Sequence, residues 1–217
     1  MKKITSQQRS PRDAILASAI DILHQHGAGA LTVRSVAVAA GCSTTGVYTW
    51  FGGKNGLVEA IFIDGFQRFG AALNVARARP PAPRPVAGLA HAYREWAITN
   101  PTHYMVMFGR AVPDFHPSVE ALLTAHGTFA QLVDATSYEM SQIELTGDPT
   151  ELAHHLWAGI HGYVSLEIAS MDMAVDSAHR RRRFDNGVRM LVRGSMQPTM
   201  SDAAANASDV NASTLHS

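Results

Sequence analysis

Residues 31–57, LTVRSVAVAAGCSTTGVYTWFGGKNGL, constrain the fold more than any other part of the chain. Thr32 is a suitable N-cap, and the apolar residues after it keep the spacing of one helical face up to a glycine, a residue that suits a helix end. Ser43 can cap a second helix, in which Val47 and Phe51 lie four residues apart on the inward side. Two short helices joined by a glycine-containing turn predict a helix-turn-helix.

The outer side of the second helix carries hydroxyl groups and no carboxylate, on Thr44, Thr45, Tyr48 and Thr49. Hydroxyl side chains can reach base edges or phosphate oxygens, and a surface without acids does not repel the phosphate backbone. We therefore expect this face to contact DNA. The alternative is a helix-turn-helix look-alike without DNA contacts, because many helical proteins contain such turns.

The same stretch resembles the DNA-binding segment of the TetR family of transcriptional regulators. Ten residues stand where the family pattern expects them: Thr32, Ala37, Ala40, Gly41, Ser43, Val47, Tyr48, Phe51, Lys54 and Leu57. Three positions depart from the pattern, since Trp50 replaces His or Tyr, Cys42 replaces Val, and Gly46 comes one position after the usual small residue. These departures affect the expected base contacts more than the expected fold.

A second resemblance lies in the C-terminal half. Residues 156–167, LWAGIHGYVSLE, resemble the Trp-x-x-x-His-Gly signature of one class of TetR-family C-terminal domains, and NPTHYMVMF at 100–108 extends the likeness. The resemblance covers most of residues 10–195. It implies an all-α fold of about nine helices, with a three-helix helix-turn-helix DNA-binding domain at 1–54 and a larger helical ligand-binding and dimerisation domain at 55–196.

Caps, prolines and apolar spacing predict the helix boundaries. Ser10 and Pro11 begin the first helix and Gly27 ends it, while the fourth runs from about Lys54 to Arg77 and links the domains. The later helices are expected at 86–99, 103–110, 118–143, 149–171 and 177–195. The proline-rich stretch 79–85 is expected to be an extended loop, with a ligand of a polyproline-binding partner as the alternative. The polar tail, 197–217, is expected to be disordered.

The net charge of zero hides an uneven distribution. Residues 1–54 contain six basic and two acidic side chains, and the remainder contains 12 basic and 16 acidic ones, so the two parts carry +4 and −4. A basic end is expected of a phosphate-binding module, and an acidic remainder does not favour DNA wrapped around the whole molecule.

Composition excludes several classes of protein. No apolar run approaches the roughly 20 residues that span a bilayer, and the start, MKKITSQQRSPRD, lacks the apolar region of a signal peptide, so we expect a cytoplasmic protein without a membrane partner. Cys42 is the single cysteine, which excludes an intrachain disulfide. We expect it to be structural rather than a redox switch. The histidines lack the spacing of metal ligands, so neither a metal site nor a cofactor is expected.

The expected DNA contacts form three groups. Base-edge contacts are expected from Thr44, Thr45 and Thr49, and phosphate contacts from Thr32, Tyr48 and Lys54, with Ser43 at the same surface. Backbone charge is expected from Arg34 and from the arm residues Lys2, Lys3, Arg9 and Arg12. Trp50 is compatible with two roles, a hydrogen bond from its indole to a phosphate or packing at the start of the fourth helix.

The expected partners are a double-stranded DNA operator and a second copy of the chain. One helix-turn-helix contacts few base pairs, so specificity calls for a two-fold dimer on a palindromic site. The resemblance implies a homodimer through the last two long helices, paired as a four-helix bundle, where Gly159 and Gly162 would permit close approach. The alternative is that these helix faces only complete the monomer core. The run Arg180 to Arg183 points all round a helix, so solvation or pairing with interface acids is expected rather than a second DNA site.

The larger domain is expected to bind an unknown small-molecule effector in an apolar pocket with scattered polar tips. Its candidate lining residues are Tyr93, Trp96, His103, Tyr104, Met107, Phe108, His126, Phe129, Trp157 and His161. Each of them is equally compatible with a place in the core, because a helical domain of this size must bury its aromatic residues.

No nucleophile elbow, phosphate loop, H-E-x-x-H motif or convincing pair of acids is found, so enzyme activity is not expected. An all-helical interaction or transport protein is the third class, and only residues 31–57 argue against it. The interpretation that joins these observations is a DNA-binding transcriptional regulator, a ligand-responsive repressor that leaves its operator when an effector enters the pocket.

Overall fold

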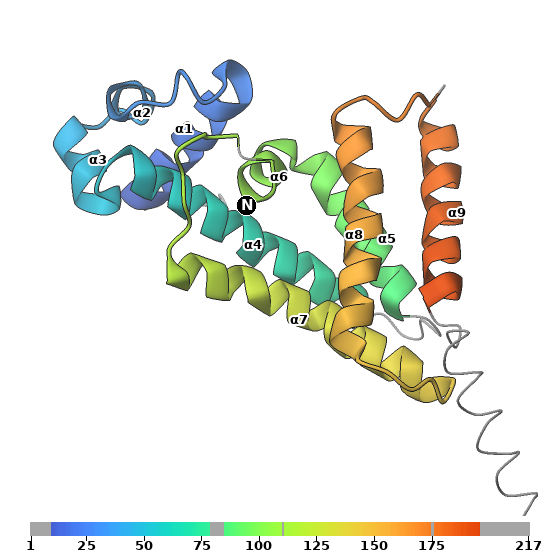
Figure 1. The fold of residues 1–217 in the computed structure, drawn as a ribbon. Coiled ribbons are helices and arrows are strands. Elements are labelled where there is room, and N and C mark those ends of the chain that lie inside the picture. The colour runs from blue at the N-terminus through green and yellow to red at the C-terminus, as the bar shows by residue number, and fades with distance from the viewer. Residues whose placement is uncertain (1–9, 79–84, 110, 175, 196–217) are drawn as a thin grey trace, which may run out of the picture. The chain divides into compact units, whose positions relative to one another are not determined.

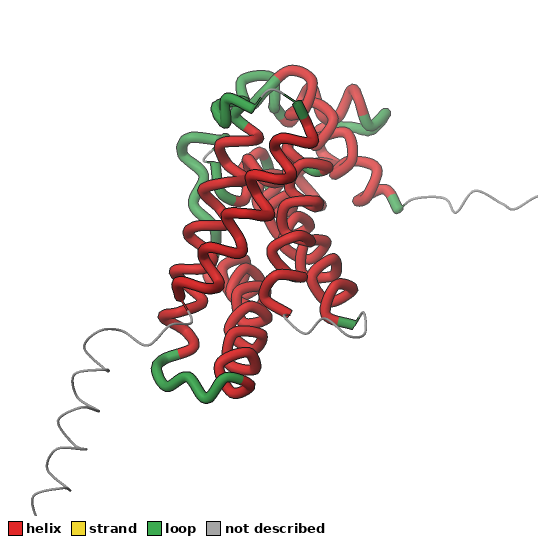
Figure 2. Tube along the Cα trace, turned by 90° about the vertical axis from the view of Figure 1, so that its right-hand side faces the viewer, coloured by secondary structure: helices red, strands yellow, loops and turns green. Residues whose placement is uncertain are grey.

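The computed structural model describes residues 10–78, 85–109, 111–174 and 176–195 (Figure 1). In these ranges the chain forms nine α-helices. Figure 2 shows the described segments as helices and loops, with no strand among them. They are α1 (Pro11–His26), α2 (Val33–Ala39), α3 (Thr44–Phe51), α4 (Lys54–Arg77), α5 (Pro85–Thr99), α6 (Pro101–Met107), α7 (Val119–Gln142), α8 (Pro149–Ile168) and α9 (Ser177–Ser195). The predicted all-α class is confirmed.

Side-chain caps begin the helices where the sequence predicts them. Ser10 accepts a hydrogen bond at 3.1 Å from the N–H of Asp13, and Pro11 occupies the first turn of α1. Asp148 accepts one at 2.8 Å from the N–H of Thr150 at the start of α8. Each cap satisfies a backbone donor that the first helical turn leaves without a partner.

Two helices differ from the predicted boundaries by two residues or more. α6 begins at Pro101 rather than at 103, because proline is already set for the first helical position, and it stops before Phe108, whose φ of −125° leaves the helical region. α8 ends at Ile168 rather than at 171, and Ser170 just beyond it has a φ of 55°. The proline-rich loop and the C-terminal tail fall at 79–84 and 196–217, outside the described residues.

The chain divides into two compact units. The first consists of Met1–Ala72 and Trp96–Thr128, and the second of Leu73–Glu95 and Phe129–Ser217. α4, α5 and α7 are each continuous through a boundary, so each contributes residues to both units. The boundaries of these units differ from the predicted boundary after residue 54. That boundary separates the expected DNA-binding domain from the expected ligand-binding domain and stays a prediction.

The core of the first unit fixes the helix-turn-helix. α1 packs against α2 and α6, and α2 packs against α3. Fully buried apolar side chains come from the loop before α2 and from α2, α3 and α4, namely Leu31, Val36, Val47, Leu57, Val58 and Ile61. Burial of such side chains, at about 1.5–3 kcal/mol each, holds the two short helices, which would not be stable alone.

The second unit contains the pair α8 and α9, which lie side by side (Figure 1). Close approach depends on two glycines. A Cβ at Gly187 of α9 would lie 2.4 Å from Cζ of Tyr163 on α8, and one at Gly159 of α8 would lie 2.5 Å from Cδ1 of Leu191 on α9. Gly159 therefore serves packing within the chain, whereas the space beside Gly162 is open.

Candidate functional site

The helix-turn-helix is built on a tight turn between α2 and α3. Gly41 has a φ of 63°, which suits glycine, and the N–H of Cys42 donates to the carbonyl of Ala37 at 3.0 Å. Ser43 then caps α3 by accepting from the N–H of Gly46 at 3.1 Å. The turn thus orients α3 through backbone and cap hydrogen bonds.

One face of α3 is held in the core and the other is exposed. Val47 and Phe51 are buried, as their spacing predicts. The predicted contact residues on the opposite face, Thr44, Thr45, Tyr48, Thr49 and Trp50, are all exposed. Tyr48 is 57% and Trp50 51% exposed, so both rings are accessible to a partner.

The hydroxyl groups of Thr49 and Thr32 already form hydrogen bonds within the chain, which limits the bonds that they can form with DNA. Oγ1 of Thr49 donates to the carbonyl of Thr45 at 2.9 Å, so it can meet DNA as an acceptor or through its methyl group. Oγ1 of Thr32 accepts from the N–H of Ser35 at 3.0 Å. Thr44 and Thr45 are exposed, and their contacts to base edges stay a prediction.

The basic residues around this face occupy different environments. Nζ of Lys54 donates to the carbonyl of Ala28 at 3.2 Å, which fixes the ammonium group at the start of α4. Since an ammonium group has three donors, this bond is compatible with a phosphate contact. The guanidinium of Arg12 lies 5.3 Å from the ring centre of Phe51, and Arg34 is exposed. The predicted contacts from the N-terminal arm before residue 10 fall outside the described residues.

The ten predicted pocket residues fall into two groups. Trp96, His103, Tyr104, Met107, Phe108 and His126 belong to the first unit, and Tyr93, Phe129, Trp157 and His161 belong to the second. In the first group the rings of Tyr104 and Phe108 are 5.1 Å apart. His103, Tyr104 and Met107 are buried, which is the core placement that the sequence left open.

His103 is satisfied by a partner that the sequence analysis missed. Its Nε2 lies 3.0 Å from Oδ2 of Asp64 on α4, which also accepts from Nε of Arg68 at 2.7 Å. Burial raises the pKa of Asp64, but the hydrogen bonds from His103 and Arg68 and their charges outweigh it, so the pKa lies below its usual value. No spacing in the sequence indicates this pair, because 39 residues separate its members.

The second group forms a polar and aromatic cluster. Tyr93 OH lies 2.9 Å from Nδ1 of His161, and Oγ of Ser165 lies 3.3 Å from Nε2 of the same ring. The ring centre of Trp157 is 5.8 Å from that of His161 and 6.1 Å from that of Phe129. Burial lowers the pKa of His161. The four-residue spacing of His161 and Ser165 on a helix could have indicated their contact.

A buried ion pair joins α5 to α8, the two helices that carry Tyr93 and His161. Nε and Nη2 of Arg94 each donate at 2.7 Å to one oxygen of Glu167, and both side chains are only 13% exposed. The guanidinium also lies 5.5 Å from the ring centre of Phe184 on α9. This pair joins three helices, and the sequence analysis did not identify it.

Within the described ranges, no group of three or more His, Cys, Asp or Glu side chains is arranged to hold a metal ion. Among the helices that are described, none is long and apolar enough to cross a membrane.

Comparisons with known proteins agree with the fold. Residues 15–61 match the family "Bacterial regulatory proteins, tetR family", and residues 86–191 match "Tetracyclin repressor-like, C-terminal domain". The HTH-type transcriptional regulator Rv1816 of Mycobacterium tuberculosis is 26% identical over 224 residues, which cover 86% of this chain and 94% of that protein.

Solved structures show the same architecture. A protein of unknown function from Rhodococcus sp. RHA1 has a TM-score of 0.70 and 25% identity, covering 86% of this chain and 98% of that one. The TetR family transcriptional regulator PfmR from Thermus thermophilus shares the fold, with a TM-score of 0.63 at 14% identity over 82% of this chain and 97% of that one. Both matched families, the exposed α3 face and the fold lead to one conclusion: the chain belongs to the TetR family of DNA-binding transcriptional regulators.

Proposed function

We propose that the chain is a ligand-responsive repressor that binds a palindromic operator as a homodimer. The observation that carries this proposal is the α3 face, on which every residue from the sequence prediction is exposed and none is acidic. A helix with such a face fits the major groove, where hydroxyl groups can bond to base edges.

The proposed contacts divide by chemistry. Thr44 and Thr45 would meet base edges, with Thr49 beside them as an acceptor, because its hydroxyl proton is already bonded within α3. Phosphates would be bound by Tyr48 and Lys54, and Trp50 would add its indole N–H. The phosphate contacts fix the position of the protein along the duplex, whereas the base-edge contacts select the DNA sequence.

A dimer is proposed because one α3 cannot select a site of useful length. The pair α8 and α9 supplies the surface, since its outward side is open at Gly162 and carries the exposed apolar side chains Leu166 and Met190. Burial of such side chains against a second copy would be favourable. The family supports this choice of helices.

The effector is proposed to contact the half-buried members of the second aromatic group, Phe129, Trp157 and His161. Half-buried rings can be reached by a ligand, whereas the fully buried residues of the first group fill the core. The effector must bind the state with low DNA affinity more tightly, and a coupling of about 1–3 kcal/mol would change operator affinity about 5- to 150-fold. We assign the coupling between effector binding and DNA binding to α4. This helix begins directly after the helix-turn-helix and is continuous into the second unit.

The experiment is a mobility-shift titration with the DNA upstream of the chain's own gene, with a scrambled duplex as competitor. Wild-type protein should give a specific shifted band, and Thr45→Glu, which places a carboxylate against the phosphates, should abolish it. Thr146→Glu changes another exposed threonine, in the loop between α7 and α8, and serves as the control. Failure of the wild-type protein to bind any palindromic duplex at low salt would overturn the proposal.

A further inference from the structure

We propose that α3 selects its operator through the methyl groups of thymine, so that T·A pairs face α3 in each half-site. This base selection rests on the proposed function, because the same face of α3 would read the bases. It follows from the composition of α3 and its cap, STTGVYTWF at 43–51, which offers hydroxyl groups, methyl groups and aromatic rings but no Arg, Lys, Asn or Gln.

The side chains that α3 lacks are those that identify guanine and adenine. Arg and Lys bind two acceptors of guanine at once, and Asn and Gln bind a donor and an acceptor of adenine. A hydroxyl group can both donate and accept a single bond, so it can bond to any base and distinguishes the bases poorly. The major-groove feature that α3 can distinguish is therefore the C5 methyl group of thymine.

Thr49 is the residue that presents a methyl group on this face. Its Oγ1 donates to the carbonyl of Thr45, one turn earlier, at 2.9 Å, so the hydroxyl is directed back along the helix. The other group on its Cβ is a methyl, and the side chain is exposed. Two apolar methyl groups, one on Thr49 and one on thymine, can then meet in the major groove.

Tyr48 is turned toward the end of α3 and away from this contact. A Cβ at Gly53 would lie 3.3 Å from Cε1 of Tyr48, so the ring lies against Gly53, next to Lys54 in the chain. Tyr48 and Lys54 are the residues proposed to bind phosphates. Base contacts by α3 are therefore left to its threonines.

The cations near the start of the chain do not lie on α3. Residues 10–54 contain three of them, on Arg12, Arg34 and Lys54. The guanidinium of Arg12 lies 5.3 Å from the ring centre of Phe51, and Nζ of Lys54 donates at 3.2 Å to a backbone carbonyl of the loop before α2. Arg34 is exposed in the first turn of α2. A guanine contact is therefore left to Arg34, outside the base pairs that face α3.

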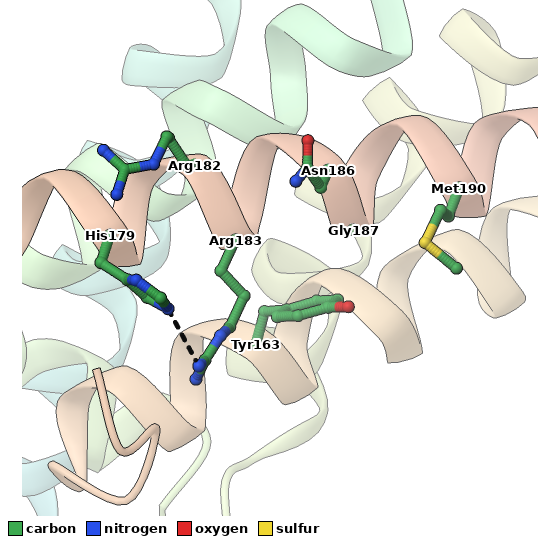
Figure 3. A pocket seen from close by; sticks show the side chains of 7 residues that line it. All are labelled: Tyr163, His179, Arg182, Arg183, Asn186, Gly187 and Met190. Carbon is green, nitrogen blue, oxygen red and sulfur yellow. Dashed lines mark hydrogen bonds between the residues drawn. The ribbon is translucent and has the colours of Figure 1, made fainter. Parts of the chain in front are cut away.

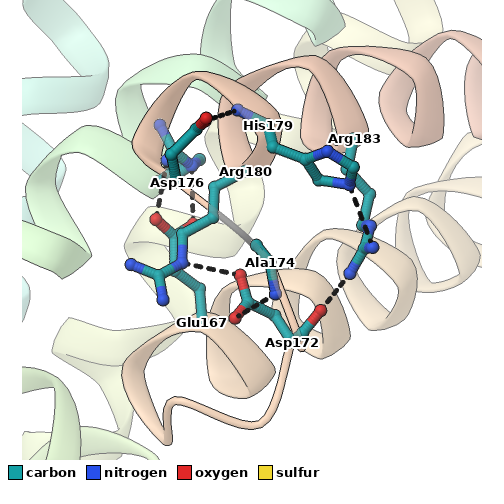
Figure 4. A network of polar contacts seen from close by, with 8 residues as sticks. Glu167, Asp172, Ala174, Asp176, His179, Arg180 and Arg183 are labelled. Carbon is teal, nitrogen blue, oxygen red and sulfur yellow. Dashed lines mark hydrogen bonds and ion pairs between the residues drawn. The ribbon is translucent and has the colours of Figure 1, made fainter.

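The arginine-rich helix α9 belongs to the second unit. Arg180 and Arg183 are bonded to Asp172, in the turn between α8 and α9 (Figure 4). Figure 3 shows Arg183, joined to His179 at 3.2 Å, beside Tyr163 of α8. Because α8 and α9 are the helices proposed to contact the second copy, we assign none of their guanidinium groups to bases.

The test begins with selection of bound duplexes from a random library by the full chain. The recovered sequences should contain an inverted repeat with a T·A pair at a fixed position of each half-site. Deoxyuridine is then placed at that position, since it lacks only the C5 methyl group and keeps the base pairing and the minor-groove edge. One replacement should weaken binding about four-fold, and replacement in both half-sites about sixteen-fold, because each methyl group is worth about one buried CH₂.

The converse change adds a methyl group to a different base pair. Replacement of the T·A pair by C·G should weaken binding, and 5-methylcytosine at the same position returns a methyl group to the major groove. The duplex with 5-methylcytosine should bind about four-fold more tightly than the duplex with cytosine. Equal binding of the two would overturn the proposal, because the preference would then depend on another feature of the T·A pair.

Variants of Thr49 distinguish its methyl group from its oxygen. Thr49→Ser keeps the hydroxyl and removes the methyl, so it should bind the thymine and uracil duplexes equally. Thr49→Val keeps a methyl and removes the hydroxyl, so the difference of about four-fold should remain. Thr146→Ser, at an exposed threonine in the loop between α7 and α8, is the matched control and should also keep the difference.

Several results would overturn the proposal while operator binding stands. They are half-sites without a T·A pair, equal affinity for thymine and uracil at every position, and a thymine–uracil difference that survives in Thr49→Ser. Loss of the difference in Thr49→Val alone would show that Thr49 acts through its oxygen, and would overturn it too. Recovery of no specific duplex would instead overturn the proposed function, and base selection by α3 with it.

Discussion

Nε2 of His103 on α6 lies 3.0 Å from Oδ2 of Asp64 on α4, and the adjacent residue, Thr102, has its Oγ1 3.0 Å from Nδ1 of His24 on α1. The short helix α6 is therefore bonded on both sides within one compact unit. Through these two contacts, α6 connects α1 to α4, the helix that follows the helix-turn-helix.

Loss of the Asp64 carboxylate should destabilise the fold. Asp64→Ala leaves the buried His103 without its partner, which we expect to lower the free energy of unfolding by about 1–3 kcal/mol. Arg68→Ala removes the exposed partner of the same carboxylate and should cost less than about 0.5 kcal/mol. Urea unfolding followed by circular dichroism measures both, and equal losses would contradict the role of α6.

Removal of Arg94 should lower the free energy of unfolding more than removal of the Asp64 carboxylate does. Arg94→Ala leaves Glu167 as a buried charge without its guanidinium, and we expect a loss of about 3–5 kcal/mol. Arg77 pairs with Asp134 at 3.6 Å on an exposed surface, so Arg77→Ala should cost at most about 1 kcal/mol. The same urea experiment compares them, and a small loss in Arg94→Ala would show that α5, α8 and α9 do not depend on this pair.

His161 should make stability depend on pH. Burial lowers its pKa below the ordinary 6.5, so below that pH the unfolded chain binds a proton more readily than the folded one. Stability should therefore fall as the pH decreases below about 6.5. His161→Gln should reduce the fall in melting temperature between pH 7.5 and 5.5, whereas the exposed His155→Gln should not. An unchanged fall in His161→Gln would disprove this assignment.

Substitutions at Gly187 and Gly162 should distinguish packing within the chain from packing between two copies of it. Gly187→Ala places a Cβ against Tyr163 and should cost about 1–3 kcal/mol in unfolding. Gly162→Ala meets open space, so folding should be unaffected or favoured by about 0.5–1 kcal/mol, while the dimer should dissociate more readily. Sedimentation equilibrium measures the dimer. Unchanged dimerisation in Gly162→Ala would place the interface away from this part of α8.

Local features of the fold could be predicted from the sequence, because caps and prolines act over a few residues. Ser10, Thr32, Ser43 and Asp148 cap helices as expected. The end of α8 could not be predicted, since apolar spacing continues past Ile168 while the chain itself turns.

The site could be predicted only in part. The exposed face of α3 follows from the positions of Val47 and Phe51, which fix the inward side. Contacts such as Arg94 with Glu167 join residues 73 positions apart, and no local pattern indicates them. Composition likewise gave the aromatic residues of the expected pocket but not which of them lie in which unit.

The most direct test of DNA binding by a dimer is the salt dependence of operator affinity in Lys54→Ala, with the exposed neighbour variant Asn55→Ala as the control. Each phosphate contact contributes roughly 0.9 to the slope of log K against log salt concentration, so loss of one contact per subunit should flatten the slope by about 2. Asn55→Ala should leave the slope unchanged. A slope in Lys54→Ala equal to that of the wild-type protein would contradict the account, and a change of only about 1 would contradict the dimer.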